Sequence, residues 1–241
     1  MRLKVAKFGG TSLASAGQMS RVADIVLADR DRRIIVVSAP GKEHGKDVKV
    51  TDLLIACADR MLADGSAVSE AKAVIDRFAR IAGDLGLPGD VMARVEKDLA
   101  DRLRGDVSHR KRFIDTMKAA GEDNCAWLFA AYLRGRGVDA QYVNPCEAGM
   151  LLSDDYGAAV VLDETYRKLN SLRQKKGILV FPGFFGATPS GHVVTFPRGG
   201  SDISGSVVAA AVRADSYENF TDVDSVFAAD PAIVPRAAPI R

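Results

Sequence analysis

Four consecutive β-branched residues at positions 34–37 constrain the fold of this chain most strongly. Continuous β-branched runs of this length are typical of strands that are buried on both faces of a parallel sheet. A second apolar strand is predicted at residues 3–8, and apolar residues recur at helical spacing across residues 19–26 between the two. The first 40 residues therefore predict a strand–helix–strand unit, the building block of α/β folds.

The rest of the chain extends this α/β pattern around a long helical insertion. The pattern from residue 52 to residue 120 is helical and charged, which predicts the insertion. The helices expected within it span 52–61, 69–85 and 91–103. Beyond it we expect helices at 122–135 and 204–212 and strands at 140–143, 177–181, 193–196 and 217–220, with 193–196 as one arm of a hairpin. These elements predict a three-layer αβα fold with a mainly parallel central sheet.

Composition argues against several classes of protein. The chain has 241 residues, of which 47% are apolar and 27% charged, as in an ordinary globular protein. A net charge of +2 gives no reason to expect nucleic acid or an anionic membrane as partner. The cysteines are three and widely spaced, which argues against a disulfide framework or a zinc site and fits a reducing cytoplasm. No signal peptide and no membrane-length apolar run is visible, so we expect a cytoplasmic protein.

A glycine pair follows the first predicted strand, in the stretch Lys7-Phe8-Gly9-Gly10. Two glycines permit positive φ and close backbone approach, and the N–H groups of a following helix can face an anion. A lysine at the end of a strand can neutralise charge on a transferred phosphoryl group. The alternative is a plain strand–helix turn with a solvated lysine. The stretch matches neither a Walker A motif nor a dinucleotide fingerprint.

A second glycine pair lies in the stretch 198–202, directly before the predicted helix at 204–212. Its arginine, Arg198, is the residue type that binds carboxylates in a planar, bidentate way. Ser201 and Asp202 lie where that helix would begin, so Asp202 could equally be a simple N-cap. Each glycine pair alone could belong to a plain turn before a helix. That interpretation is weaker for two such pairs together, one with a lysine and one with an arginine.

Two further polar stretches are ambiguous when taken alone. Residues 221–224 follow a predicted strand, at the position where α/β sheets place ligands, but Asp222 or Asp224 could also form an Asx turn. Residues 121–124 precede or open a predicted helix, and acids in a first helical turn suit the helix dipole. Glu122 alone would therefore be interpreted as a solvated acid.

In chain order, these stretches resemble the aspartokinases, which have the amino-acid kinase fold. The matching stretches are KFGGTS (7–12), VVSAPGK (36–42), VTDLL (50–54), GEDN (121–124), PGFFG (182–186), RGGSD (198–202), ENFTDVD (218–224) and DP (230–231). The resemblance implies phosphorylation of the side-chain carboxylate of L-aspartate by ATP, with Mg²⁺, giving 4-phospho-L-aspartate. This reaction is the first step of lysine, threonine and methionine biosynthesis.

The resemblance also implies a role for each matching residue. Lys7 and Asp202 are implied to be catalytic, with Asp202 orienting the lysine. The residues implied to hold aspartate are Ser38, Thr51, Glu122, Phe184, Arg198 and Ser201, with Glu122 on the amino group and Arg198 and Ser201 on the carboxylates. The residues implied to bind ATP are Lys7, Gly9, Gly10, Thr221, Asp222 and Phe227, the last in place of a tyrosine often seen beside the adenine.

The resemblance divides the chain into two lobes. Residues 1–196, with the insertion at 52–120, match the aspartate-binding lobe, and residues 197–241 match the nucleotide-binding lobe. The family continues further, through the rest of this lobe and paired regulatory ACT domains. We therefore expect an incomplete nucleotide lobe and a chain that is catalytically feeble alone. Ala232 and Ser225 replace a common arginine and glycine. The full-length enzyme is expected to be a homo-oligomer.

Two alternative functions stay open at this point. One is a kinase of the same fold for another small acid, such as N-acetylglutamate, glutamate or carbamate. The pairing of GEDN with RGGSD argues against it, because a free amino group calls for an acid such as Glu122 and an acylated amine does not. The other is an inactive binding fragment of a regulated enzyme. In an aspartate kinase, as in a kinase for another small acid, the substrate carboxylate is already an anion near neutral pH. Catalysis would therefore depend on positioning and charge neutralisation.

Overall fold

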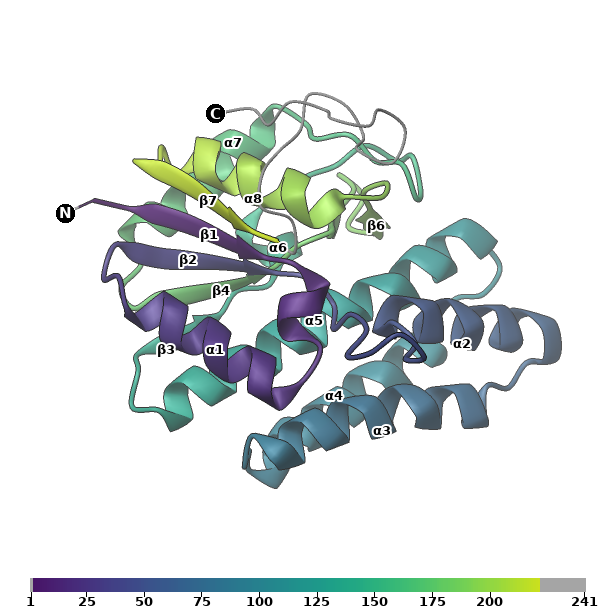
Figure 1. The fold of residues 1–241 in the computed structure, drawn as a ribbon. Helices are drawn as coiled ribbons and strands as arrows, with labels where there is room; N and C mark the ends of the chain where they lie inside the picture. The colour runs from purple at the N-terminus through teal and green to yellow at the C-terminus, as the bar shows by residue number, and fades with distance from the viewer. Residues whose placement is uncertain (1, 222–241) are drawn as a thin grey trace, which may run out of the picture.

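The computed structural model describes residues 2–221, which form an α/β structure around a five-stranded sheet (Figure 1). The strand order is β3-β4-β2-β1-β7, and every neighbouring pair is parallel. The strands are β1 (Lys4–Phe8), β2 (Arg32–Val37), β3 (Ala140–Tyr142), β4 (Ile178–Pro182) and β7 (Ser216–Phe220). The prediction of a mainly parallel sheet is therefore confirmed, and each strand lies within two residues of its predicted limits.

Helices cover both faces of the sheet, so the three-layer prediction is also confirmed. Helices α1 (Ala16–Leu27) and α5 (Arg110–Gly135) lie on one face, and α7 (Glu164–Leu169) and α8 (Gly200–Ala211) lie on the other (Figure 1). Successive residues of a strand point to opposite faces, and the central strands supply two separate cores in this way. In β2, Ile35 and Val37 belong to the core beneath α1 and α5, whereas Ile34 and Val36 belong to the core beneath α8.

The helical insertion packs beside the sheet rather than on it (Figure 1). It consists of α2 (Val50–Asp64), α3 (Val68–Asp84), α4 (Gly89–Leu103) and the first half of α5. Each of the three shorter helices buries one apolar stripe, such as Val74, Phe78 and Ile81 in α3. Helix α5 is 26 residues long and continues from the insertion into the layer over the sheet. It therefore holds the insertion and the sheet in one body.

The start of α5 corrects the sequence analysis, which placed a helix at 122–135. The helix begins at Arg110, after His109, whose side chain accepts a hydrogen bond from the Arg112 N–H at 3.2 Å. Gly121 lies inside the helix, and a Cβ atom on it would stand 2.8 Å from the Cβ of Ala39. This glycine marks a close approach of two segments and not a helix start. The acids that follow Gly121 are therefore far from the positive end of the helix dipole.

The start of α8 requires a smaller correction. This helix begins at Gly200, preceded by Gly199 as N-cap in the left-handed region with φ +84°. Asp202 lies in the first turn, so its interpretation as an N-cap was wrong. The expected hairpin is present, because β5 (Phe185–Ala187) pairs antiparallel with β6 (Val193–Thr195). Four short elements were not predicted from the sequence: η1 (Gly10–Leu13), α6 (Pro145–Ala148), α7 and η2 (Asn170–Gln174).

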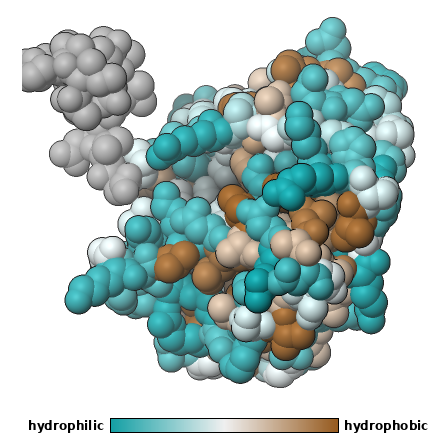
Figure 2. Space-filling view, turned by 90° about the vertical axis from the view of Figure 1, so that its right-hand side faces the viewer, coloured by the Kyte–Doolittle hydropathy of each residue, from teal (hydrophilic) through white to brown (hydrophobic). Residues whose placement is uncertain are grey.

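The surface of the described residues is mostly hydrophilic. Figure 2 shows a face on which apolar residues form small patches between polar ones. The large hydrophobic residues that are exposed, such as Val68 and Val160, are few beside the two buried cores. Within residues 2–221 no helix combines the length and the apolar character that crossing a membrane requires.

The close packing of two loops at the edge of the sheet gives a stability prediction. A Cβ atom on Gly41 would stand 2.7 Å from the carbonyl carbon of Gly10, which is backbone and cannot rotate away. We expect Gly41→Ala to lower the free energy of unfolding by roughly 1–3 kcal/mol, measured by urea denaturation. Gly17→Ala is the matched control, because nothing lies within 4 Å of its Cβ position. It should be neutral or slightly stabilising. Equal stability of both variants would contradict the tight packing.

Candidate active site

A cavity of about 520 Å³ opens where β1, β2 and β4 end, which is the usual position for ligands in parallel α/β sheets. It also borders helices α2, α5 and α8. Every residue that the sequence analysis assigned to aspartate binding or catalysis lines this cavity. These residues are Lys7, Ser38, Thr51, Glu122, Phe184, Arg198, Ser201 and Asp202. The fold thus collects into one site side chains that are distributed over most of the sequence.

Other residues line the same cavity that were not predicted from the sequence. They include Lys49, Asp52, Lys118, Gly157 and Phe196. Lys49 and Asp52 flank the predicted Thr51, and Gly157 and Phe196 come from loops without a motif. Lys118 lies one helical turn before Glu122 on α5, so the helical spacing of four could have identified it. The wrong start of that helix concealed this relation.

Lys7 is buried at the cavity wall and forms an ion pair with Asp202. Its Nζ lies 2.6 Å from Oδ1 of Asp202, and only 5% of the residue is exposed. The Asn219 side-chain amide donates a hydrogen bond to the same oxygen at 3.0 Å. The acid therefore fixes the position of the lysine ammonium, while its own side chain stays about half exposed, at 49%. A lysine in this setting is not the solvated residue of a plain turn.

The first glycine pair adjoins Lys7 but does not adopt the positive φ that the sequence analysis allowed. Gly9 has a φ of −71°, and Gly10 opens the short helix η1. The Gly9 N–H donates to the Phe220 carbonyl at 3.1 Å, and a Cβ on Gly9 would stand 3.7 Å from the Lys7 Nζ. Only Gly10 is needed for close packing, because a Cβ on it would stand 2.7 Å from the Ala39 carbonyl oxygen, whereas 3.7 Å at Gly9 is an ordinary contact. Both glycines and Thr221 are not among the cavity residues, and Asp222 and Phe227 lie outside the described residues.

Glu122 is a buried acid with unused hydrogen-bonding capacity. It is 5% exposed, and its Oε2 has no hydrogen-bond partner among the described residues. Burial raises the pKa of this carboxyl from 4.5 to about 8, although the Ala39 backbone, Lys118 and Ser201 act in the opposite direction. A buried acceptor without a partner is costly for the fold. The position therefore suits a cationic ligand group that would supply the missing partner.

Cationic side chains face the same cavity as Glu122. Arg198 is exposed at the cavity, in the turn before α8. Lys118 is only 15% exposed in its side chain, and its Nζ lies 5.2 Å from the centre of the Phe184 ring. Phe184 itself has a φ of +74°, a strained value for a non-glycine residue. An acid and several cations in one cavity are suited to a small ligand that carries both signs of charge.

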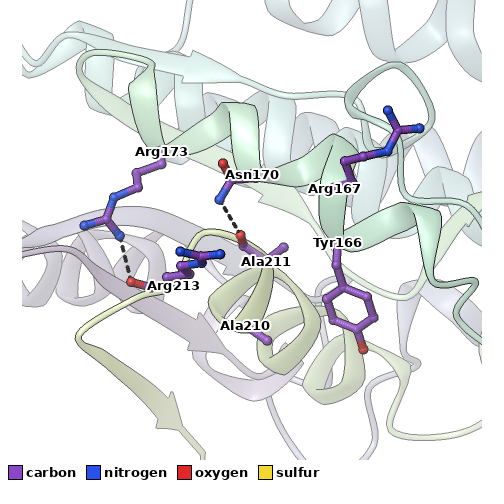
Figure 3. Close-up of a pocket in the computed structure, with 7 residues that line it drawn as sticks. All are labelled: Tyr166, Arg167, Asn170, Arg173, Ala210, Ala211 and Arg213. Carbon is purple, nitrogen blue, oxygen red and sulfur yellow. Dashed lines mark hydrogen bonds between the residues drawn. The ribbon is translucent and has the colours of Figure 1, made fainter.

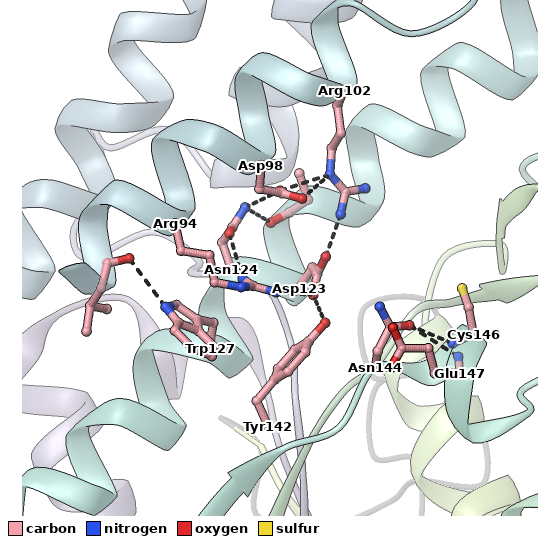
Figure 4. Close-up of polar contacts among 12 residues, drawn as sticks. Arg94, Asp98, Arg102, Asp123, Asn124, Trp127, Tyr142, Asn144, Cys146 and Glu147 are labelled. Atoms are coloured by element: carbon pink, nitrogen blue, oxygen red, sulfur yellow. Dashed lines mark hydrogen bonds and ion pairs between the residues drawn. The ribbon is translucent and has the colours of Figure 1, made fainter.

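The two residues that follow Glu122 do not line the cavity but belong to a polar network between α5, α4 and β3 (Figure 4). Asp123 pairs with Arg102 at 2.5 Å and accepts a hydrogen bond from the Tyr142 hydroxyl. Asn124 donates to the Asp98 carboxylate on α4 at 2.8 Å. Both are almost fully buried. This half of the GEDN stretch fixes the helix and does not belong to the cavity.

A second groove, of about 700 Å³, lies between α7, η2 and the end of α8 (Figure 3). None of the predicted site residues lines it. Its polar groups satisfy the last carbonyls of α8. Arg173 donates to the carbonyl oxygens of Val212 and Arg213, each at 2.7 Å, and Asn170 donates to that of Ala211 at 2.8 Å. These side chains therefore cap a helix end.

The parallel sheet, with a cavity at the carboxyl ends of its strands, places the chain among the α/β proteins whose ligand sites lie at this edge. Comparison with known proteins makes the assignment specific. The chain belongs to the amino acid kinase family, whose model matches residues 2–241.

Individual relatives agree with this assignment. The chain is 50% identical to aspartokinase 3 of Bacillus subtilis over 232 residues, which are 96% of this chain and 51% of that protein. It is 30% identical to lysine-sensitive aspartokinase 3 of Escherichia coli, over 97% of this chain and 52% of that protein. The crystal structure of E. coli aspartokinase III in complex with aspartate and ADP superimposes with a TM-score of 0.83 at 29% identity, covering 99% of this chain and 53% of that one. The chain spans about half the length of these relatives.

The raised pKa of Glu122 predicts a stability that depends on pH. The folded protein keeps this proton up to about pH 8, whereas the unfolded chain releases it near pH 4.5. The Glu122 carboxyl therefore lowers the free energy of unfolding as pH rises from 4.5 to about 8, and the whole of this loss is present above pH 8. We expect Glu122→Gln to raise the free energy of unfolding by roughly 2–4 kcal/mol at pH 8 and hardly at all at pH 4. Urea denaturation at a series of pH values measures this.

The control for that experiment is Glu96→Gln, which removes an exposed acid from α4. Its effect on stability should be small and nearly independent of pH. If Glu122→Gln gave the same flat profile, the pKa of the carboxyl would be the same in the folded protein as in the unfolded chain.

Proposed function

We propose that this protein is an aspartate kinase, which transfers the γ-phosphate of ATP to the side-chain carboxylate of L-aspartate and forms 4-phospho-L-aspartate. The observation that carries the proposal is the unpartnered, buried carboxylate oxygen of Glu122 in a cavity that also contains Lys7 and Arg198. A free amino acid with an anionic side chain offers an ammonium group to Glu122 and carboxylates to Lys7 and Arg198. The similarity to aspartokinases supports the same substrate.

The cavity residues suggest how aspartate would bind. Its ammonium group would pair with Glu122 and supply the missing partner of Oε2. Arg198 and Ser201 would bind carboxylate, with Ser38 and Thr51 as further hydrogen-bonding side chains. Phe184 would form an apolar wall. The cavity thereby offers a complementary group for each polar part of the substrate.

The reaction needs little acid–base chemistry from the protein. An aspartate carboxylate is ionised near neutral pH, so it can attack without a general base. One of its oxygens would bond to the γ-phosphorus while the bond to the bridging oxygen breaks, and ADP would leave. The main barrier is the approach of two anions, which Lys7 and the N–H groups at the start of α8 would offset. Asp202 would hold Lys7 in place for this task.

The nucleotide and its metal would enter from the side of α8 and β7. We assign nucleotide binding to residues 197–241 together with Lys7, Gly9 and Gly10, and aspartate binding mainly to residues 1–196. Among residues 2–221 no group of three or more His, Cys, Asp or Glu side chains could hold a metal ion. Mg²⁺ would therefore be bound mostly by the phosphates of ATP, where it neutralises their charge.

The alternatives differ from this proposal in specific ways. A kinase for an acylated amino acid such as N-acetylglutamate would bring no ammonium group and would leave Glu122 buried without a partner. A binding protein without catalysis would not need the Lys7–Asp202 ion pair at the cavity wall. The first alternative differs from the proposal in the substrate, and the second differs in having no catalysis. One assay of phosphoryl transfer with several acids therefore distinguishes both from an aspartate kinase.

That assay traps the acyl phosphate with hydroxylamine in the presence of MgATP. We expect hydroxamate from L-aspartate but not from N-acetylglutamate, glutamate or carbamate. Lys7→Met should reduce the rate at least about 100-fold, because it removes the cation that offsets the developing charge. Lys72→Met is the matched control, since Lys72 is exposed on α3, and its rate should not change. Hydroxamate formed only from another acid, or an unchanged rate in Lys7→Met, would contradict the proposal.

A further inference from the structure

A buried arginine outside the cavity takes no part in the proposed binding of substrate. Arg77 lies on α3, in the helical insertion, and is only 5% exposed. It does not line the cavity at the carboxyl ends of the strands. Taking a charged side chain out of water is costly, so a buried arginine has to be held by specific contacts. Those of Arg77 are with two segments that lead into the cavity.

One nitrogen of the guanidinium group makes these contacts. Nη2 of Arg77 donates to the carbonyl oxygens of Ala14 and Gly41, each at 2.9 Å, and lies 2.7 Å from Oδ2 of Asp47. Ala14 is the C-cap of the short helix η1, which begins at the first glycine pair. Gly41 and Asp47 belong to the loop 38–49 between β2 and α2. Arg77 therefore joins this loop to the segment that follows β1.

Asp47 extends the contact to the second half of the loop. Its carboxylate accepts hydrogen bonds from the N–H groups of Glu43 and Val48, each at 2.9 Å. Burial raises the pKa of Asp47, but these two hydrogen bonds and the Arg77 guanidinium outweigh burial and hold the pKa below its usual value. The acid is therefore ionised at neutral pH and binds this part of the loop to the buried cation.

The two joined segments carry side chains of the cavity. Lys7 lies just before the glycine pair and η1, whereas Ser38 and Lys49 are the two ends of the loop and Thr51 follows in the first turn of α2. All four line the cavity. A shift of the loop relative to the segment after β1 would therefore change the distances between these groups.

We propose that Arg77 is a positioning residue for phosphoryl transfer, which holds the loop 38–49 against the segment after β1 in the geometry that the reaction needs. The inference rests on the proposed function. A misplacement of reacting groups by about 1 Å can cost on the order of 100-fold in rate, so a fixed loop matters for catalysis. The proposal also gives the helical insertion a task, because α3 supplies the arginine.

The competing explanation is that Arg77 only stabilises the packing of the insertion on the rest of the fold. Its hydrogen bonding argues against this. Nε and Nη1 are buried and have no hydrogen-bond partner among the described residues, and Oε2 of Glu43 lies 4.0 Å from Nη1, too far for a hydrogen bond. Buried donors without partners cost stability, and an apolar side chain is often as stabilising as a buried ion pair. Arg77 is thus better suited to positioning the two segments than to stabilising the fold.

Limited digestion with trypsin tests the effect on the loop without any substrate. Lys42 and Lys46 are exposed in the loop, and cleavage after them requires the loop backbone to open. We expect cleavage after these lysines, identified by mass spectrometry, to be at least about 10-fold faster in Arg77→Met, because local opening becomes easier. Arg80→Met is the matched control. Arg80 is about half exposed on the same helix and contacts the loop only through Glu43, at 3.4 Å, so the cleavage rate should hardly change.

The hydroxylamine assay tests the effect on catalysis. We expect kcat with L-aspartate to fall about 10- to 100-fold in Arg77→Met, while the KM values for L-aspartate and ATP change less than about 3-fold. The groups that bind both substrates remain in the variant, and only their relative placement is lost. Arg80→Met should match the unmodified protein in kcat and KM. Urea denaturation establishes that each variant is folded under the assay conditions.

A third variant tests whether Arg77 acts through Asp47. Asp47→Asn should also accelerate cleavage of the loop and lower kcat. The double variant Arg77→Met/Asp47→Asn should be hardly worse than Arg77→Met alone, because two residues that act as one unit are not additive. The double variant leaves no carboxylate without its cation, so it replaces Arg77→Met in both assays if that single variant does not fold.

An unchanged kcat in the folded arginine variant, or an unchanged rate of cleavage in the loop, would overturn the assignment of Arg77 while the proposed function stands. Fully additive losses in the double variant would also contradict it, because Arg77 and Asp47 would then act separately. If the unmodified protein formed no hydroxamate from L-aspartate, the proposed function would be wrong and the catalytic role of Arg77 with it.

Discussion

The site depends on three segments that approach one another more closely than side chains would allow. Ala39, just after β2, lies between the turn at Gly10 and the middle of α5 at Gly121. A Cβ on Gly10 would stand 2.7 Å from the Ala39 carbonyl oxygen, and one on Gly121 would stand 2.8 Å from the Ala39 Cβ. This packing brings β1, the end of β2 and α5 together, so that Lys7, Ser38 and Glu122 reach one cavity. The glycines are required by the contact and not by their backbone angles.

The same packing removes water from Glu122, and this has opposite consequences for stability and function. A buried carboxyl with an unpartnered oxygen resists ionisation, as its pKa of about 8 indicates, and weakens the fold near neutral pH. An ammonium group that enters the cavity supplies the opposite charge and the missing hydrogen bonds. Its interaction with the carboxylate is strong because little water competes. A ligand with a free amino group would therefore bind where an unpartnered buried carboxyl lowers the stability of the protein alone.

Most of the fold was predictable because its strands and the shorter helices of the insertion have strong local signals. The β-branched run of β2 could hardly be anything but a buried strand, and α3 and α4 each bury a single apolar stripe. Residues at the ends of parallel strands necessarily meet at one edge of the sheet. Lys7, Ser38 and Phe184 lie at or just after the ends of β1, β2 and β4, but only the resemblance to the aspartokinases assigned all three of them to one site.

Helix α5 had no such signal, for a physical reason. It lies between the insertion and the sheet, and every residue from 119 to 126 is buried. A stretch that is packed on all sides shows no amphipathic period, so the helix could not be followed through residues 119–126 and its start was placed at residue 122. The error concealed Lys118, because its relation to Glu122 exists only if both belong to one helix. The wrong helix start also left Asp123 and Asn124 without a predicted structural role.

The burial of the middle of α5 on all sides also explains how the helix can position charged groups accurately. One side presents Lys118 and Glu122 to the cavity, while Asp123 and Asn124 on another side are bound to Arg102 and Asp98 of α4. A rotation of the helix that moved Glu122 out of the cavity would break those buried polar contacts, which is costly in a medium with little water. The network in the insertion and the acid in the cavity are thus two faces of one rigid element. A binding group on such an element keeps its geometry better than one on a loop, which is what the proposed transfer between two anions would require.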